Sequence, residues 1–173
     1  MKNFGARFSL YPMSDKFIPI ILGALEKTDT TGLYSNTDRI STVYGGSAEN
    51  VVTAVENLFV NSYTEGVHGA VEGIFSNSES FDISDTTVKK EIAADFPVKC
   101  MVAVYGGEKS ENIFAEFERT TQTKNEKIPY GLRLEGSVNR VWAEIKELAL
   151  SLEKSDEKFT LYFKMNCNSP TAE

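Results

Sequence analysis

The sequence predicts an α+β protein that contains the same strand–helix–strand–strand–helix–strand unit twice. The first observation is the stretch from Phe8 to Met13 (FSLYPM), in which apolar and polar side chains alternate as in a strand that Pro12 ends. The second observation is repetition. A weaker copy of this stretch begins at Val102, Gly46-Ser47 recurs as Gly136-Ser137, and Asn77-Ser78 recurs as Asn168-Ser169. Three matches in the same order, each about ninety residues apart, indicate an internal duplication.

The first half of the chain supplies the elements of one unit in order. The opening strand precedes a helix over 15–27, where apolar residues recur at helical spacing and Ser14 occupies the N-cap position. Two short strands follow, at 33–36 and 39–44, and Gly45-Gly46 is expected to end the second. Ser47 then caps a second helix, and residues 69–76 form the last strand. This order is that of a ferredoxin-like unit, with both helices on one face of an antiparallel sheet.

The second half repeats this order after a polar segment. Residues 77–96 are rich in Ser, Asp and Thr, include a possible helical turn at 88–94, and are predicted to be a linker. The elements expected after it are a strand at 98–105, a helix capped by Ser110, two short strands within 127–135, a helix from 138 and a closing strand from 159. The predicted boundaries are therefore a first repeat at 1–78, a linker at 79–96 and a second repeat at 97–173.

Each predicted sheet leaves one face uncovered by helices, with apolar and mixed side chains on it. Faces of that size are usually covered in soluble proteins. The two sheets are therefore expected to pack on each other or on those of a second copy, which predicts a homodimer or an intramolecular pairing of sheets. Small-molecule sites tend to form at such junctions.

Composition restricts the classes of partner. The formal charge of −7 and the pI of about 4.9 argue against nucleic acid or an anionic membrane as a partner. No apolar run is long enough to insert in a bilayer, and the N-terminus lacks the apolar region of a signal peptide, so a cytoplasmic location is expected. The 2 cysteines and 1 histidine favour neither a disulfide framework nor a metal site.

The sequence offers little material for catalysis. It contains no phosphate-binding loop, nucleophile elbow or zinc-protease motif, and no catalytic residue is predicted. Glu72 is the unusual acidic residue, because it lies in the middle of a predicted strand where a carboxylate needs a partner. That partner is expected to be Arg7 or Arg39 on a neighbouring strand, or an amine of a ligand.

Hydroxyl groups on the first and third strands of the first repeat point instead to ligand binding. These strands are adjacent at the centre of a ferredoxin-like sheet, so Ser9 and Ser41 are expected to lie close together, with Thr42 beside them. Hydroxyls both donate and accept hydrogen bonds, which suits a neutral ring with several nitrogens. A tyrosine could stack on that ring, and the candidates are Tyr11, Tyr34 and Tyr44.

The motifs RFSLYPM from Arg7, KTDT from Lys27 and TDRISTV from Thr37 resemble those of the YkoF-like thiamin/hydroxymethylpyrimidine-binding family. The resemblance is dense over 5–78 and weaker over 96–170. It implies a tandem duplication that dimerises and a cytosolic binder of thiamin or its pyrimidine moiety, associated with uptake or salvage and an uptake-system partner. It implies no catalysis, and no cofactor beyond the ligand itself. It also places Ser9, Tyr11, Met13, Ser41 and Thr42 near the ligand.

The second half departs from the family pattern, because Tyr105 is followed by two glycines where the family tends to repeat Tyr-Pro-Met. The resemblance therefore implies that a second site at Tyr105 is altered or lost. Two other functions stay open from the residues alone. One is an enzyme of thiamin metabolism with Glu72 or Tyr11 as acid or base, and the other is a sensor or assembly module that binds protein through its sheet face.

Overall fold

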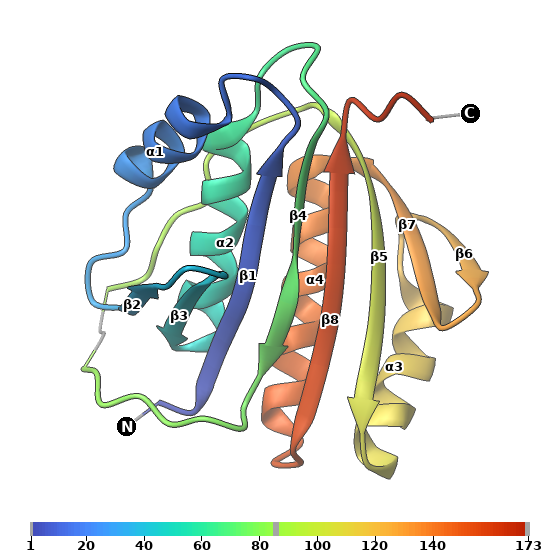
Figure 1. The fold of residues 1–173 in the computed structure, drawn as a ribbon. Helices are drawn as coiled ribbons and strands as arrows, with labels where there is room; N and C mark the ends of the chain where they lie inside the picture. The colour runs from blue at the N-terminus through green and yellow to red at the C-terminus, as the bar shows by residue number, and fades with distance from the viewer. Residues whose placement is uncertain (1, 85–86, 172–173) are drawn as a thin grey trace.

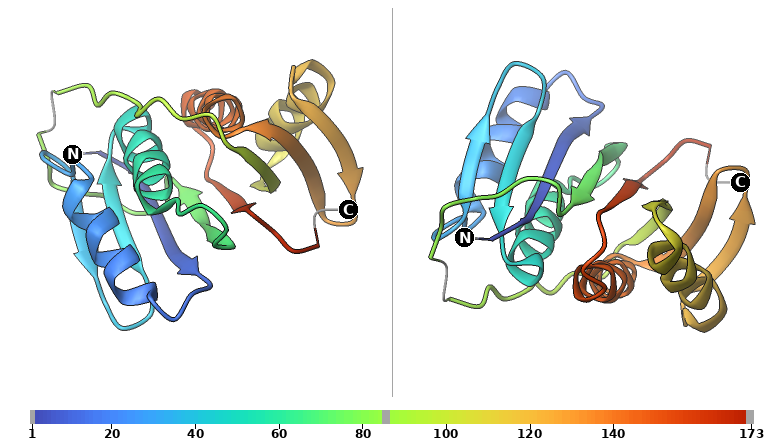
Figure 2. Two further views of the ribbon diagram at one scale, coloured as in Figure 1. Left: turned by 90° about the horizontal axis from the view of Figure 1, so that it is seen from above. Right: turned by 90° about the horizontal axis from the view of Figure 1, so that it is seen from below.

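The described part of the chain forms an eight-stranded sheet with four helices on one face (Figures 1 and 2). The computed structural model describes residues 2–84 and 87–171. Met1, positions 85–86 of the predicted linker and positions 172–173 of the predicted second repeat lie outside them. The elements are β1 (Phe4–Pro12), α1 (Phe17–Lys27), β2 (Tyr34–Thr37), β3 (Thr42–Gly46), α2 (Ala48–Ser62), β4 (Gly69–Ser76), β5 (Pro97–Gly106), α3 (Glu108–Thr120), β6 (Lys124–Ile128), β7 (Gly131–Ser137), α4 (Val138–Lys154) and β8 (Phe159–Cys167).

The strand order confirms the predicted fold class. The order is β2-β3-β1-β4-β8-β5-β7-β6, and every neighbouring pair is antiparallel. Each half thus has the ferredoxin-like arrangement, in which the first strand lies between the third and the fourth.

The two halves are joined edge to edge through β4 and β8. These strands pair from Gly69 opposite Cys167 to Ser76 opposite Thr160, so backbone hydrogen bonds continue across the junction. The predicted packing of two sheets on each other within the chain is therefore wrong. β4 and β8, which would be edge strands if the repeats were separate, satisfy their backbone groups by pairing with each other. The open face of one repeat therefore continues into that of the other.

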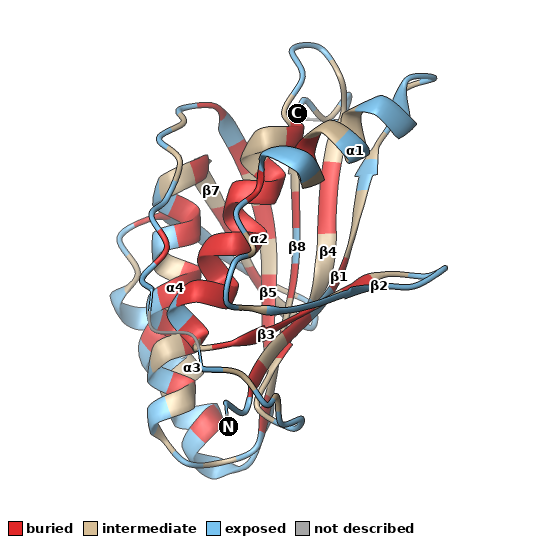
Figure 3. Ribbon diagram, turned by 90° about the vertical axis from the view of Figure 1, so that its left-hand side faces the viewer, coloured by how far each residue is buried: buried red, intermediate tan, exposed pale blue. Residues whose placement is uncertain are grey.

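The core lies between the sheet and the two central helices, α2 and α4. In the view of Figure 3 their buried residues face the sheet. Phe75 of β4 stacks on Phe163 of β8 with ring centroids 4.6 Å apart, and Trp142 of α4 packs edge-on against both rings. The core is therefore continuous across the repeat junction. The outer helix α1 is different, since Ala24 is its only buried residue among those described.

Several predicted elements are confirmed. The last strand of the first repeat covers Gly69–Ser76, as predicted. Ser47 caps α2, and its hydroxyl accepts a hydrogen bond from the backbone N–H of Asn50. The long helix of the second repeat begins at Val138, directly after Ser137.

Two predicted helix caps are wrong. Ser14 does not cap α1, because the helix begins at Phe17 and the Ser14 hydroxyl accepts from the N–H of Lys16 in the preceding turn. Ser110 is not the cap of α3 but a buried residue inside it, where its N–H and hydroxyl both donate to the carboxylate of Glu157. A long-range carboxylate thus replaces the local cap that the sequence suggests.

The strand predicted at 39–44 is also displaced. β3 begins at Thr42 and includes Gly45 and Gly46, which were expected to end the strand. The preceding turn is held by Asp38, whose side chain accepts from the N–H groups of Ile40 and Ser41. This local arrangement keeps residues 38–41 out of the sheet.

The helical turn predicted at 88–94 is absent, because asparagine side chains hold this segment in a non-helical conformation. Asn57 donates to the carbonyl of Lys90 and accepts from the N–H of Ile92, and Asn139 of α4 accepts from the N–H of Ala94. These bonds take the backbone groups that a helical turn would use. The segment is therefore bound to both central helices.

Candidate functional site

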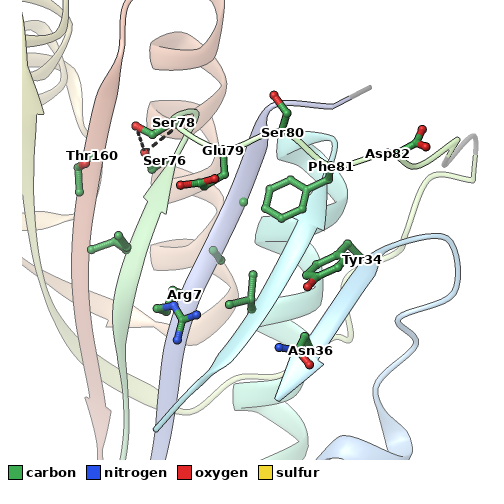
Figure 4. A pocket seen from close by; sticks show the side chains of 14 residues that line it. Arg7, Tyr34, Asn36, Ser76, Ser78, Glu79, Ser80, Phe81, Asp82 and Thr160 are labelled. Carbon is green, nitrogen blue, oxygen red and sulfur yellow. Dashed lines mark hydrogen bonds between the residues drawn. The ribbon is translucent and has the colours of Figure 1, made fainter. Parts of the chain in front are cut away.

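A cavity of about 870 Å³ lies on the open face of the first repeat (Figure 4). It is open on one side, and its floor is formed by strands β1 to β4. Residues 77–82, here called the strap, cross over its rim after leaving β4. The cavity, here called the first pocket, is lined by Gly5, Ala6, Arg7, Tyr34, Asn36, Val43, Ile74, Ser76, Ser78, Glu79, Ser80, Phe81, Asp82 and Thr160.

The floor of the first pocket is a row of paired residues across four strands. Tyr34 pairs with Gly45, Gly45 with Gly5, and Gly5 with Ser76. The ring of Phe81 occupies the space above the two glycines, where added Cβ atoms would lie 2.3–2.8 Å from ring atoms. Only residues without side chains leave room for this ring on the sheet. The pair Gly5/Gly45 therefore serves as a platform for an aromatic ring.

Tyr34 and Phe81 form an aromatic pair at one wall of the pocket. Their ring centroids are 5.2 Å apart, with planes tilted by 36°. Tyr34 is 43% exposed, so part of its ring remains available to another molecule. Figure 4 shows the two rings side by side, Phe81 from the strap and Tyr34 from the edge strand β2. An aromatic wall of this kind suits a flat ligand ring.

The strap is anchored at both ends. At its start, Asn77 donates to the carbonyl of Glu157 and accepts from the N–H of Phe159, which ties it to the second repeat. Near its end, Phe81 forms an antiparallel bridge with Lys2 at the beginning of the chain. These contacts fix the position of the Phe81 ring over the floor.

The charges around the first pocket are mostly negative. Glu79 and Asp82 stand exposed on the strap, while Arg7 contributes the positive charge from the floor. Arg7 donates to Asp38 at 3.0 Å and to the hydroxyl of Ser41 at 2.6 Å. Hydrogen bonds from the backbone of Ile40 and Ser41, helped by Arg7, lower the pKa of Asp38 to about 2. Arg7 is thus already paired with a carboxylate that is ionised at neutral pH.

Four of the residues predicted from the sequence line a separate and smaller hollow of about 200 Å³. These are Ser9, Tyr11, Ser41 and Thr42, and the hollow lies between the end of β1, the turn before β3 and α1. The Ser9 hydroxyl donates to the carbonyl of Ile40, and the Thr42 hydroxyl pairs with that of Thr37 at 3.0 Å. The structure brings this group together as expected, but each of these two hydroxyls already has a partner within the chain.

The remaining predicted residues are dispersed. Tyr34 lines the first pocket, while Met13 is exposed just beyond β1 and Tyr105 is exposed near the end of β5. Tyr44 is 1% exposed and packs edge-on against Phe8 in the core, and burial raises its pKa to about 12. Its ring therefore lies on the helix-facing side of the sheet and cannot stack on a ligand of the open face.

The predicted pairing of Glu72 with Arg7 or Arg39 is wrong. Neither Arg7 nor Arg39 reaches it. The Tyr162 hydroxyl donates to Glu72 at 2.7 Å, and Lys164 lies at 3.6 Å from its other oxygen. Burial, followed by the hydrogen bond to Glu72, raises the pKa of Tyr162. Both partners come from β8, so Glu72 fastens the junction between the repeats.

Sequence reasoning missed the residues that shape the first pocket. Phe81 lies in a segment interpreted only as linker, and Gly45 was expected only to end a strand. The available signal was an aromatic residue, Phe81, among small polar ones, together with Gly5 near the start of the chain. Among the described residues, no group of three or more His, Cys, Asp and Glu side chains could hold a metal ion. No helix in the described ranges has the length and apolarity needed to cross a membrane.

Comparison with known proteins gives two matches. Residues 3–80 match the model of the YKOF-related family, which covers the first repeat and most of the strap. The chain is also 28% identical over 184 aligned positions to YkoF of Bacillus subtilis (strain 168), whose name gives HMP/thiamine binding as its proposed role. That alignment covers 96% of this chain and 91% of the Bacillus protein. The resemblance to the YkoF family that the sequence motifs indicate is thereby confirmed, through the family model in the first repeat and through this relative over nearly the whole chain.

Proposed function

We propose that this protein is a non-catalytic binding protein for thiamin or its hydroxymethylpyrimidine moiety, and that the first pocket holds the ligand. The similarity to YkoF of Bacillus subtilis supports the ligand class. The main support for placing the ligand in the first pocket is the aromatic wall of Tyr34 and Phe81. It borders a cavity of about 870 Å³, which is large enough for a small heteroaromatic molecule. The smaller hollow at Ser9 has about 200 Å³, which is less than such ligands usually occupy.

The chemistry of the lining supports this ligand class. A pyrimidine ring stacked on Tyr34 would expose its nitrogens and amino group to the polar rim, where Asn36 and the serines of the strap offer both donors and acceptors. The thiazolium ring of thiamin is positively charged, and the acidic side chains of Glu79 and Asp82 favour a cation nearby. The pocket thus matches a flat ligand that is neutral at one end and cationic at the other.

The proposed role is to bind the precursor in the cytoplasm during its uptake or salvage, as a homodimer that delivers it to a partner of the uptake system. The continuous open face supports the dimer, because Tyr105 and Ile74 are exposed on it and a second copy could cover them. The scarcity of titratable clusters supports binding without chemistry. After incubation with the protein, thiamin should be recovered unchanged by mass spectrometry, and a new product would contradict this role.

Replacing Tyr34 with alanine is expected to weaken thiamin binding about tenfold or more, because loss of a stacking partner costs about 1–3 kcal/mol. Tyr34→Phe should retain most of the affinity, since the ring and not the hydroxyl forms the wall. Isothermal titration calorimetry of both variants measures this. Ser9→Ala is the matched control, and it should stay within about twofold of the unchanged chain. If Ser9→Ala weakens binding and Tyr34→Ala does not, the ligand binds in the smaller hollow and the proposed location is wrong.

The stoichiometry is expected to be one tightly bound thiamin per chain. The aromatic wall belongs to the first repeat, and the residue of the second repeat that corresponds to Tyr34 is Lys124. Titration calorimetry of the full chain counts the sites directly. Two equal sites per chain would contradict the assignment, as would loss of binding on Tyr105→Ala with no effect of Tyr34→Ala.

A further inference from the structure

Lys89 is a lysine with an almost fully buried side chain, in the connection that continues from the strap towards the second repeat. The side chain is 2% exposed. Charged side chains are seldom buried to this extent unless they are paired. The ammonium group of Lys89 donates to the carbonyl of Thr31, 58 residues earlier, at 2.8 Å, and it lies 3.4 Å from the carboxylate of Asp29. Both partners belong to the loop between α1 and β2.

The backbone around Lys89 is fixed on α2. The N–H of Lys89 donates to the side-chain oxygen of Asn50 at 2.8 Å, and the side-chain amide of Asn50 donates to the carbonyl of Thr87 at 2.8 Å. Asn50 is 4% exposed and lies in the first turn of α2. Asn57 of the same helix holds the residues that follow in the same way. Lys89 therefore extends from a rigid support, and its ammonium group is a fixed point for the loop that it contacts.

This loop leads directly into Tyr34, which forms one half of the aromatic wall. Tyr34 is the third residue after Thr31. Within the loop, the N–H of Thr31 donates to the carboxylate of Asp29 at 2.9 Å. Hydrogen bonding from Thr31, with a smaller effect of Lys89, lowers the pKa of Asp29. The carboxylate is therefore ionised at neutral pH and can keep both contacts.

The strand that carries Tyr34 has little other support. β2 has 4 residues, all of them exposed. It is an edge strand and pairs with β3 alone, so Tyr34 has Gly45 as its neighbour on one side only. Short segments with few buried contacts open easily. The position of Tyr34 therefore depends on the loop before it as well as on the sheet.

We infer that Lys89 is a positioning residue of the first pocket, because its ammonium group holds the loop before Tyr34 and thereby keeps the Tyr34 ring against Phe81. The connection after β4 then determines both rings of the wall. The strap supplies Phe81, and Lys89, further along the same connection, fixes the loop of Tyr34. The expected effect on thiamin affinity rests on the proposed function, whereas the placement of the ring does not.

Lys89→Met is expected to weaken thiamin binding about fivefold to tenfold, because a hydrogen bond from a charged donor no longer holds the loop. Methionine keeps most of the apolar stem of lysine, so packing is largely retained. Lys90→Met is the matched control, since Lys90 is the exposed neighbour of Lys89, and it should stay within about twofold of the unchanged chain. Titration calorimetry measures all of these affinities.

A double variant shows whether Lys89 acts through the tyrosine ring. Lys89→Met combined with Tyr34→Ala should bind thiamin as weakly as Tyr34→Ala alone, because there is no longer a ring to position. Losses that multiply in the double variant would overturn the inference, as would an unchanged affinity in Lys89→Met.

Nuclear Overhauser effects between the ring protons of Tyr34 and Phe81 measure the positioning without a ligand. With ring centroids 5.2 Å apart, the two rings should give cross-peaks in the unchanged chain and in Lys90→Met. Lys89→Met should lose most of this intensity while circular dichroism shows that it is still folded. A lysine that contributes only to stability would leave the rings in contact, so full cross-peaks in Lys89→Met would overturn the inference.

Asp29→Ala is the second variant and decides the matter if Lys89→Met does not fold. The side chain of Asp29 is 64% exposed, so its removal leaves the core intact. It should reduce the cross-peaks and weaken thiamin binding about threefold, because the loop loses a partner of Lys89 and of the Thr31 N–H. Unchanged cross-peaks in this variant would then overturn the inference. If the unchanged chain binds no thiamin but Lys89→Met loses the cross-peaks, the proposed ligand is wrong and the positioning of Tyr34 by Lys89 stands.

Discussion

Replacing Trp142 with alanine is expected to lower the free energy of unfolding by about 3–5 kcal/mol, the largest effect of any substitution considered for this chain. Trp142 is 0% exposed and packs against Phe75 of β4 and Phe163 of β8, with centroids 6.5 and 5.6 Å away. Its removal leaves a cavity directly beneath the strand pair that joins the repeats. The surrounding rings belong to the sheet, so they have little freedom to close that space.

A second substitution shows which property of the Trp142 side chain stabilises the fold. The indole nitrogen of Trp142 is buried without a hydrogen-bond partner, so the side chain contributes through volume and contact alone. Trp142→Phe should therefore cost less than about half as much as Trp142→Ala. Urea unfolding followed by circular dichroism measures both free energies. Tryptophan fluorescence cannot be used, because Trp142 is the only tryptophan in the sequence and both variants lack it.

The control for Trp142 is Leu22→Ala in the exposed part of α1, which should change stability by less than about 0.5 kcal/mol. Because the core is continuous across the junction, all variants should unfold in a single transition. A cost for Trp142→Ala below about 1 kcal/mol would contradict the assigned packing. Two separate transitions would show instead that the repeats are independent.

The sequence could predict the elements because their signals are local. Alternation identifies β1, helical spacing identifies α2 and α4, and Ser47 marks a helix start by its own hydrogen bond. The edge-to-edge junction has no such signal. It is made by backbone groups of β4 and β8, which every strand possesses, so side-chain patterns do not reveal which edges pair.

The candidate site was predictable only in part, for two physical reasons. Thr42 and Tyr44 belong to a strand in which successive side chains alternate between faces, so they could not share the open face with Ser41 or Val43. A tyrosine can lie either in the core or on the open face, so the sequence did not determine on which face of the sheet Tyr44 lies. Phe81 was missed because a bridge to Lys2 and two glycines on other strands determine its position. Contacts of that range leave no pattern in the neighbouring residues.

Stability is expected to fall as the pH rises from about 5 to 8, through one buried carboxylate at the repeat junction. Glu56 of α2 is 1% exposed. Asn139 donates to one of its oxygens at 2.8 Å, and Lys146 of α4 lies 3.9 Å from the other, while Lys146 also pairs with Glu91. Burial raises the pKa of Glu56 from 4.5 to about 7, against the opposite effects of Asn139 and Lys146.

The direction of this pH dependence follows from the protonation of Glu56 in the folded and unfolded chain. Between the ordinary pKa of 4.5 and the raised pKa of about 7, the folded chain keeps a proton on Glu56 that the unfolded chain releases. Raising the pH through this window therefore favours unfolding, and above it the buried charge remains as a cost of about 3 kcal/mol. Other acidic residues whose pKa values are lowered, such as Glu91 and Glu157, titrate below this window.

Replacing Glu56 with glutamine removes the titration and keeps the shape. The glutamine carbonyl can still accept from Asn139, and Lys146 retains Glu91 as its partner. Glu56→Gln should therefore equal the unchanged chain in stability near pH 5 and exceed it by about 2–3 kcal/mol near pH 8, as measured by urea unfolding across this range. Glu147→Gln, an exposed change on α4, is the control and should leave the pH dependence unaltered.

An identical pH slope in Glu56→Gln and the unchanged chain would show that Glu56 is not the responsible group. The alternative outcome, a loss of stability at every pH, would mean that the attraction between Glu56 and Lys146 exceeds the cost of burying the charge. The geometry argues against that, because the 3.9 Å separation is long and one Glu56 oxygen has no hydrogen-bond partner. Glu56 and Lys146 follow the cap serines Ser47 and Ser137 at the same distance, so they are equivalent residues of the two repeats. Two copies of the same charged residue at these equivalent positions would repel where α2 meets α4, whereas a protonated Glu56 beside Lys146 does not.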